Sequence, residues 1–146
     1  MEKLLISACL LGVNCCWNGG SNGPDPNVAA LMEKHTLIPV CPEQLGGLPT
    51  PRVPAERRGA IVATKDYRDV TEEFERGAEE ALSLARLYGC RYAILKERSP
   101  SCGSGQIYDG TFHNRLTDGY GVTAALLTAY GITVIGESRL PGFVFE

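Results

Sequence analysis

Short apolar runs alternate with helical segments along this chain, and the alternation restricts the fold more than any other feature. The runs cover residues 3–8, 36–40, 92–96 and 132–136, and each is too short for a stable helix. Strands that alternate with helices are typical of an α/β protein, because a right-handed crossover returns each strand to the same direction. We therefore predict a three-layer α/β/α sandwich with a mostly parallel central sheet of about four or five strands, and a single domain over residues 1–146.

The helices between these runs are marked by caps and by periodicity. Asp25 followed by proline has the form of an N-cap and a first helical turn, which predicts a helix that continues to His35. A long helix begins after a cap at Asp69 or Thr71, since apolar residues recur there at helical spacing. Gly89 supplies its C-terminal stop.

The remaining segments are predicted from composition. A last helix is expected over residues 121–129, and residues 60–63 form a short strand outside the parallel sheet. The glycine-rich and proline-rich stretches at 10–26, 42–59 and 97–119 are predicted to be loops.

Composition restricts the compartment and the partners. A chain of 146 residues builds a sufficient core without disulfides, although it has six cysteines. It shows no secretory signal and no apolar run of the ~20 residues that a membrane span needs. We expect a cytoplasmic protein, monomer or homodimer, in which clustered cysteines bind metal or act in catalysis. A net charge of −3 without a long basic run argues against a nucleic-acid partner.

Three cysteines follow predicted strands. Cys9, Cys41 and Cys102 follow the first, second and third runs. Because the carboxyl ends of parallel strands meet at one edge of a sheet, we expect the three thiolates to converge where such sheets bind ligands. Cys90 precedes the third strand, so it belongs to the opposite edge, where a buried apolar role is expected.

This trio points to a metal centre. Three thiolates can hold a [4Fe–4S] cluster and leave one iron open, and an open position distinguishes catalytic from structural metal sites. A four-thiolate structural zinc site is an alternative, although the short knuckle spacing typical of such sites is missing. Cys15 and Cys16 lie in the first loop, and either is a candidate fourth ligand, a nucleophile or a bystander.

Two polar residues beside the cysteines are candidates for catalysis. Glu43 lies two residues after Cys41, and a carboxylate held beside thiolates and away from water is suited to proton transfer near neutral pH. Ser101 precedes Cys102 and would orient a water or a substrate heteroatom, a local turn cap being the other interpretation. Three loop arginines either offset the negative charge, bind an anion or form a solvated surface patch: Arg52, Arg57 and Arg58.

Five longer segments carry a family resemblance. They are SACLLG at 7–12, CPEQLGGLPTPR at 41–52, LKERSPSCG at 95–103, IYDGTF at 107–112 and GVTA at 121–124. Together they resemble compact bacterial proteins, long filed as a domain of unknown function, whose characterised members are 2-thiouracil desulfidases. The resemblance covers nearly the whole chain.

The resemblance implies a mechanism. A [4Fe–4S] cluster bound by Cys9, Cys41 and Cys102 would take the thiocarbonyl sulfur of a thiolated nucleobase on its open iron, and uracil and sulfide would be released without redox change. By the same resemblance, Glu43 would transfer protons and Ser101 would activate water.

The chain departs from the family pattern at one place. The first loop of the family commonly runs basic-aromatic-Asp-Gly, whereas this chain has Cys16-Trp17-Asn18-Gly19, so a charged substrate contact there is missing. Two functions other than desulfidase stay open at this point: a sulfur carrier or thiolation accessory protein that loads sulfide on the cluster, and a zinc-binding structural protein.

Overall fold

Four parallel strands form the central sheet of the computed structural model, which describes the whole chain, residues 1–146. The strands are β1 (Lys3–Ser7), β2 (Thr36–Val40), β5 (Tyr92–Leu95) and β8 (Thr133–Gly136), in the spatial order β2, β1, β5, β8. The middle strands β1 and β5 are buried on both faces, which explains why their sequences are continuous apolar runs. The predicted parallel sheet is confirmed.

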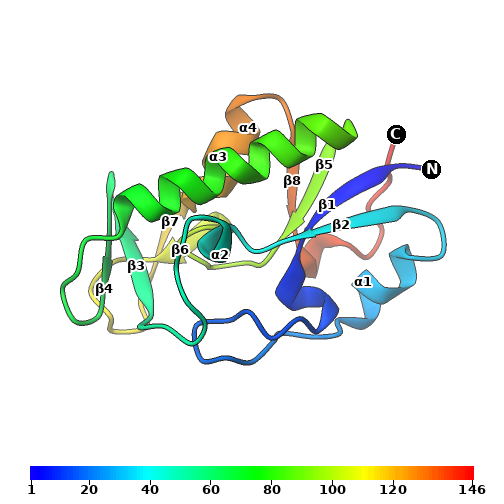
Figure 1. Cartoon of the computed structure of the whole chain (residues 1–146). Coiled ribbons are helices and arrows are strands. Elements are labelled where there is room, and N and C mark those ends of the chain that lie inside the picture. Colours follow the sequence, from blue (N-terminus) through cyan, green and yellow to red (C-terminus); the bar gives the residue numbers. More distant parts are fainter.

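Helical segments cover both faces of this sheet (Figure 1). Alternate residues of β1 divide between two cores: Leu5 packs with one face, Leu4 and Ile6 with the other. The first face carries α3 (Thr71–Tyr88) and α4 (Val122–Ala129), and the second carries η1 (Ala8–Leu11), α1 (Pro26–Leu31) and η2 (Glu137–Arg139). The predicted three-layer arrangement is therefore confirmed.

The first helix begins as predicted but ends early. The Asp25 carboxylate accepts hydrogen bonds from two backbone N–H groups of the first turn, at 2.9 and 3.3 Å. Helix α1 ends at Leu31, so the predicted extension to His35 was wrong. His35 Nδ1 accepts a hydrogen bond from the Glu2 backbone N–H at 3.0 Å, and this contact holds the chain beside the start of β1.

The long helix α3 begins and ends where predicted, but its N-cap is Val70, not Asp69 or Thr71. Asp69 Oδ1 accepts a hydrogen bond from the backbone N–H of Thr71 at 2.9 Å, and Gly89 closes the helix in the left-handed conformation with φ 66°. Its buried face points to the sheet and to α4. No helix of the chain combines the length and apolarity that crossing a membrane requires.

The segments predicted as loops contain regular structure, and this prediction was wrong. They hold the helix α2 (Pro42–Leu45) and the strands β3 (Ala55–Arg58), β6 (Ser104–Tyr108) and β7 (Leu116–Tyr120). Strand β3 pairs with β4 (Ile61–Thr64), and β6 pairs with β7, so two antiparallel hairpins form. Polar and glycine residues dominate β3, β6 and β7, so no apolar alternation marked them as strands. The short strand β4 lies outside the parallel sheet, as predicted.

Two glycines let α2 lie directly against α3. A Cβ atom at Gly46 would approach the carbonyl oxygen of Glu73 to 1.9 Å, and one at Gly77 would approach the carbonyl oxygen of Pro42 to 1.9 Å. Because α2 begins immediately after Cys41, this contact between backbones determines where the residues that follow β2 are held.

Alanine at position 77 tests that contact. Helix propensity alone would make Gly77→Ala stabilising by about 1 kcal/mol. We expect instead a loss of about 1–3 kcal/mol in the free energy of unfolding, because the methyl group forces α2 away from α3. Chemical denaturation measures the change, and Ser83→Ala on the exposed face of α3 is the matched control. Stabilisation by both substitutions would show that α2 moves without cost.

Candidate active site

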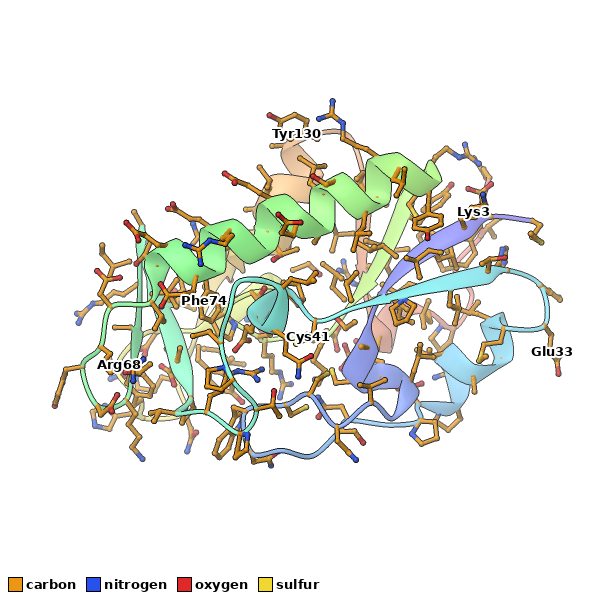
Figure 2. All side chains as sticks on the ribbon, viewed as in Figure 1. Lys3, Glu33, Cys41, Arg68, Phe74 and Tyr130 are labelled. Carbon is orange, nitrogen blue, oxygen red and sulfur yellow. The ribbon has the colours of Figure 1, made fainter.

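A cavity of about 640 Å³ opens at the carboxyl edge of the central sheet. Its wall is built from the residues that follow β1, β2 and β5, from the first loop, and from the two hairpins. Figure 2 labels Cys41 at the end of β2, next to α2. Open parallel sheets bind ligands at this edge, since strand ends and loops converge there.

The structure brings the three strand-end cysteines to this cavity. Cys9 lies in η1 directly after β1, Cys41 directly after β2, and Cys102 after the turn that follows β5, and all three line the cavity wall. Cys90 does not line it, and packs in the core beneath α3 and α4. The separation of Cys90 from the trio follows from its place before β5.

The three sulfurs influence one another. Burial is the main factor that raises the pKa of the Cys9 thiol to about 11, and the sulfurs of Cys16 and Cys41 raise it as well. Burial likewise raises the pKa of Cys102 to about 12, with a further contribution from Cys9. Thiolates crowded in this way are stabilised when a cation binds among them and displaces their protons.

The arrangement fits a cluster better than a single ion. No three histidine, cysteine, aspartate or glutamate side chains converge where one metal ion would bind them. A structural zinc site needs four ligands around one ion, so the zinc alternative has no ligand set in this arrangement. Each cysteine of an iron–sulfur cluster binds a different iron, so the sulfurs stand further apart. Cys9, Cys41 and Cys102 line one cavity without converging where a single ion would bind, which is compatible with a cluster.

The second pair of cysteines lies in the first loop and lines the same cavity. The carbonyl oxygen of Cys15 accepts a hydrogen bond from the Cys41 thiol at 3.8 Å, and burial raises the pKa of the Cys15 thiol to about 12. The Cys16 sulfur accepts a hydrogen bond from Asn22 Nδ2 at 3.2 Å. The loop that departs from the family pattern is therefore bonded to the strand-end cysteines and to itself.

Glu43 lines the cavity as an ion pair, not as an isolated carboxylate. Its Oε1 accepts a hydrogen bond from Arg52 Nε at 2.9 Å, and the Arg52 side chain is only 7% exposed. The same guanidinium donates to the carbonyl oxygen of Cys15 at 2.9 Å, to Thr50 Oγ1 at 2.9 Å and to the carbonyl oxygen of Pro49 at 3.2 Å. One buried cation thus joins the first loop to the segment that carries Glu43.

The other two arginines, Arg57 and Arg58, do not line the cavity. Arg57 donates to the carbonyl oxygens of Gly59 at 2.9 Å and Tyr120 at 2.5 Å, and so ties the β3–β4 hairpin to β7. Arg58 ends β3 on the exposed side. Lysine and arginine side chains that line the cavity besides Arg52 are Lys65, Lys96 and Arg98, and Lys96 pairs with Glu137 Oε2 at 2.8 Å.

Ser101 does not line the cavity wall, and its contact with water or substrate stays a prediction. Its hydroxyl is 2.8 Å from Thr123 Oγ1 and both side chains are buried, because the Ser-Pro-Ser turn directs Ser101 toward α4. The cap of this turn is Ser99, whose Oγ accepts hydrogen bonds from the backbone N–H groups of Ser101 at 3.1 Å and Cys102 at 3.0 Å.

Comparison with known proteins places this site in a family. The model of the family described as 2-thiouracil desulfurase matches residues 4–139. This chain belongs to the 2-thiouracil desulfurase family. The resemblance seen in the sequence motifs is confirmed.

Two relatives extend the comparison. This member of the desulfurase family is 42% identical to the uncharacterized protein YbbK of Bacillus subtilis, over 94% of this chain and 97% of that protein. A solved structure described as the [4Fe-4S]-dependent thiouracil desulfidase TudS is 50% identical and superposes with a TM-score of 0.92, covering 97% of this chain and 94% of the other. The agreement extends to nearly the whole of both folds.

Removal of the buried guanidinium tests its role in this desulfurase-family site. We expect Arg52→Gln to lower the free energy of unfolding by about 2–4 kcal/mol, since it leaves Glu43 and two carbonyl oxygens without their partner. Urea denaturation measures the loss. Arg68→Gln removes an exposed arginine and should change stability by less than about 0.5 kcal/mol. Equal changes in the free energy of unfolding for the two substitutions would contradict the role of Arg52 in joining these segments.

Proposed function

We propose that this chain is a desulfidase that replaces the thiocarbonyl sulfur of thiolated pyrimidine bases by oxygen, with 2-thiouracil as the reference substrate. Water is the second reactant, and uracil and hydrogen sulfide are the products. The carbon keeps its oxidation state, so no electron carrier is needed. The observation that carries the proposal is the convergence of three strand-end cysteines and Glu43 on one cavity in a member of this family.

Cys9, Cys41 and Cys102 are the proposed ligands of a [4Fe–4S] cluster, the cofactor on which the solved relative is described as dependent. A bound cluster with three protein ligands would supply a Lewis-acidic iron for the thiocarbonyl sulfur. The chain supplies the soft donors, and β1, β2 and β5 hold each donor at a separate strand end.

Glu43 is the proposed proton carrier. Arg52 occupies its Oε1, so Oε2 is the oxygen available to a water molecule in the cavity. Glu43 would begin the reaction as a base, with its free oxygen directed to the water. It would take a proton from the water that adds to the C2 carbon, and return a proton to the sulfur as the C–S bond breaks.

Ser101 is proposed as a positioning residue for Cys102. Its hydroxyl and that of Thr123 form a buried pair at 2.8 Å behind the cysteine. Ser7, at the end of β1, accepts a hydrogen bond from the backbone N–H of Lys96 at 2.9 Å and also interacts with the Cys102 thiol. These hydroxyls would hold the third donor in place, Ser7 from the cavity wall and Ser101 from behind it.

Loss of one cysteine ligand tests the cofactor and the reaction together. After anaerobic cluster reconstitution, we expect the unaltered chain to convert 2-thiouracil to uracil and sulfide over many turnovers. Cys41→Ala should lose bound iron and turnover, and Cys90→Ala, in the core away from the cavity, should keep both. Iron analysis measures the bound cofactor, and sulfide analysis with chromatography of uracil measures turnover.

Two outcomes would contradict this function. Full turnover by an iron-free Cys41→Ala protein would exclude the cluster mechanism. Sulfide that stays on the protein after one round, without further turnover, would favour the sulfur-carrier alternative.

The role of Glu43 has a separate test. Glu43→Gln keeps the shape of the side chain but cannot accept a proton, so we expect unchanged iron content and a kcat lowered by about 10²-fold or more. Steady-state kinetics on the reconstituted protein measures kcat. The control is Glu75→Gln on the exposed face of α3, which removes the same charge and should leave kcat unchanged. A full kcat in Glu43→Gln would show that another group carries the proton.

A further inference from the structure

Three aromatic side chains line the cavity without an aromatic partner. They are Trp17 from the first loop, Tyr108 from the end of β6, and Phe112 from the turn between β6 and β7. The ring contacts within the chain join His35, Tyr92, Phe143 and Phe145, away from this site. None of the three cavity rings belongs to a hydrophobic core cluster. The three rings thus stack neither on one another nor on another ring of the chain.

Phe112 is also held in a costly backbone conformation. Its φ is 59°, in the left-handed region, where a side chain other than glycine costs about 1–2 kcal/mol. The four non-glycine residues with positive φ are Tyr67, Arg98, Phe112 and Asn114, and all but Tyr67 line the cavity. Strained residues persist where the surrounding structure imposes them, and they gather at functional sites.

A carboxylate from the neighbouring hairpin imposes this conformation. Glu56 Oε1, on β3, accepts hydrogen bonds from the backbone N–H groups of Gly110 at 3.0 Å and Phe112 at 3.1 Å. Asp109 Oδ1 accepts another from the backbone N–H of Thr111 at 2.9 Å. The turn is therefore rigid, and it keeps a half-buried phenyl ring at the cavity wall at the expense of backbone strain.

We propose that Phe112 is the stacking surface for the pyrimidine ring, and so a specificity-determining residue for planar bases; this rests on the proposed function. Stacking of a base on an aromatic side chain contributes about 1–3 kcal/mol and needs only a flat π-system. The ring does not read the atom attached to C2, so it binds the thiocarbonyl substrate and the carbonyl product equally. Uniform binding of this kind changes KM and leaves kcat unaltered.

Glycine at this position separates a binding role from a structural role. Phe112→Gly removes the ring and also relieves the backbone strain. We expect the thermal midpoint to stay within about 2 °C of the original value or to rise, while KM for 2-thiouracil rises about tenfold, equivalent to about 1.4 kcal/mol, and kcat changes less than about twofold. Phe112→Leu keeps the strain and the apolar character but loses the flat face, and should raise KM to a similar extent. Phe112→Tyr keeps the flat face and should leave KM near its original value.

Two further measurements complete the design. Tyr67→Gly relieves the same kind of strain at a residue that is 94% exposed and outside the cavity, and should leave KM unchanged. The chain has one tryptophan, Trp17 at the cavity wall, so its fluorescence reports uracil binding to the reconstituted protein without turnover. The dissociation constant for uracil should rise about tenfold in Phe112→Gly and Phe112→Leu.

The outcomes distinguish the two proposals. Unchanged KM and uracil affinity in Phe112→Gly and Phe112→Leu would overturn the stacking role, and a marked loss of thermal stability with unchanged KM would assign the ring to folding. Uracil binding that depends on Phe112, in a protein that does not convert 2-thiouracil, would support the stacking surface and refute the desulfidase activity. Absence of both uracil binding and turnover would refute both.

Discussion

Parallel pairing of β1 with β2 and β5 is the constraint on which the rest of the site depends. The register sets Ser7 opposite Val40 and Ile6 opposite Ile94, so the three strands end together. The residues that follow each strand must then lie at one edge. If any of these strands ran antiparallel, its cysteine would lie at the far end of the sheet, and the three sulfurs would not share a cavity.

Strand direction alone was enough to predict the cysteine trio, since the prediction needed only where Cys9, Cys41 and Cys102 stand relative to apolar runs. The sequence could not predict where side chains point within a turn. Ser101 is adjacent to Cys102, yet its hydroxyl turns toward Thr123, because the Ser99 cap and the packing of α4 decide the direction. Such contacts join residues far apart in the chain, and no local pattern reports them.

The hairpins were missed for a related reason. Strand β3 has the sequence AERR and β7 the sequence LTDGY, neither of which alternates apolar and polar residues. These strands do not build the main core. They are held instead by side-chain bonds to the backbone, such as Arg57 to the carbonyl oxygen of Tyr120 at 2.5 Å and Glu56 to the Phe112 turn. Tertiary hydrogen bonds of this kind override local propensity, and only the folded chain shows them.

The two sides of the molecule thus follow different physical rules. On the side of α3 and α4, apolar burial and the glycine that ends α3 agree with the sequence pattern, and prediction succeeded. On the cavity side, a buried Arg52, raised thiol pKa values and left-handed residues such as Phe112 each oppose local preference or simple burial. A chain tolerates such costs where they position groups for a ligand, since the rest of the fold compensates for them. Apart from Tyr67 and the core residue Cys90, the places where local rules fail here surround one cavity, and this is an independent physical reason to locate the chemistry there.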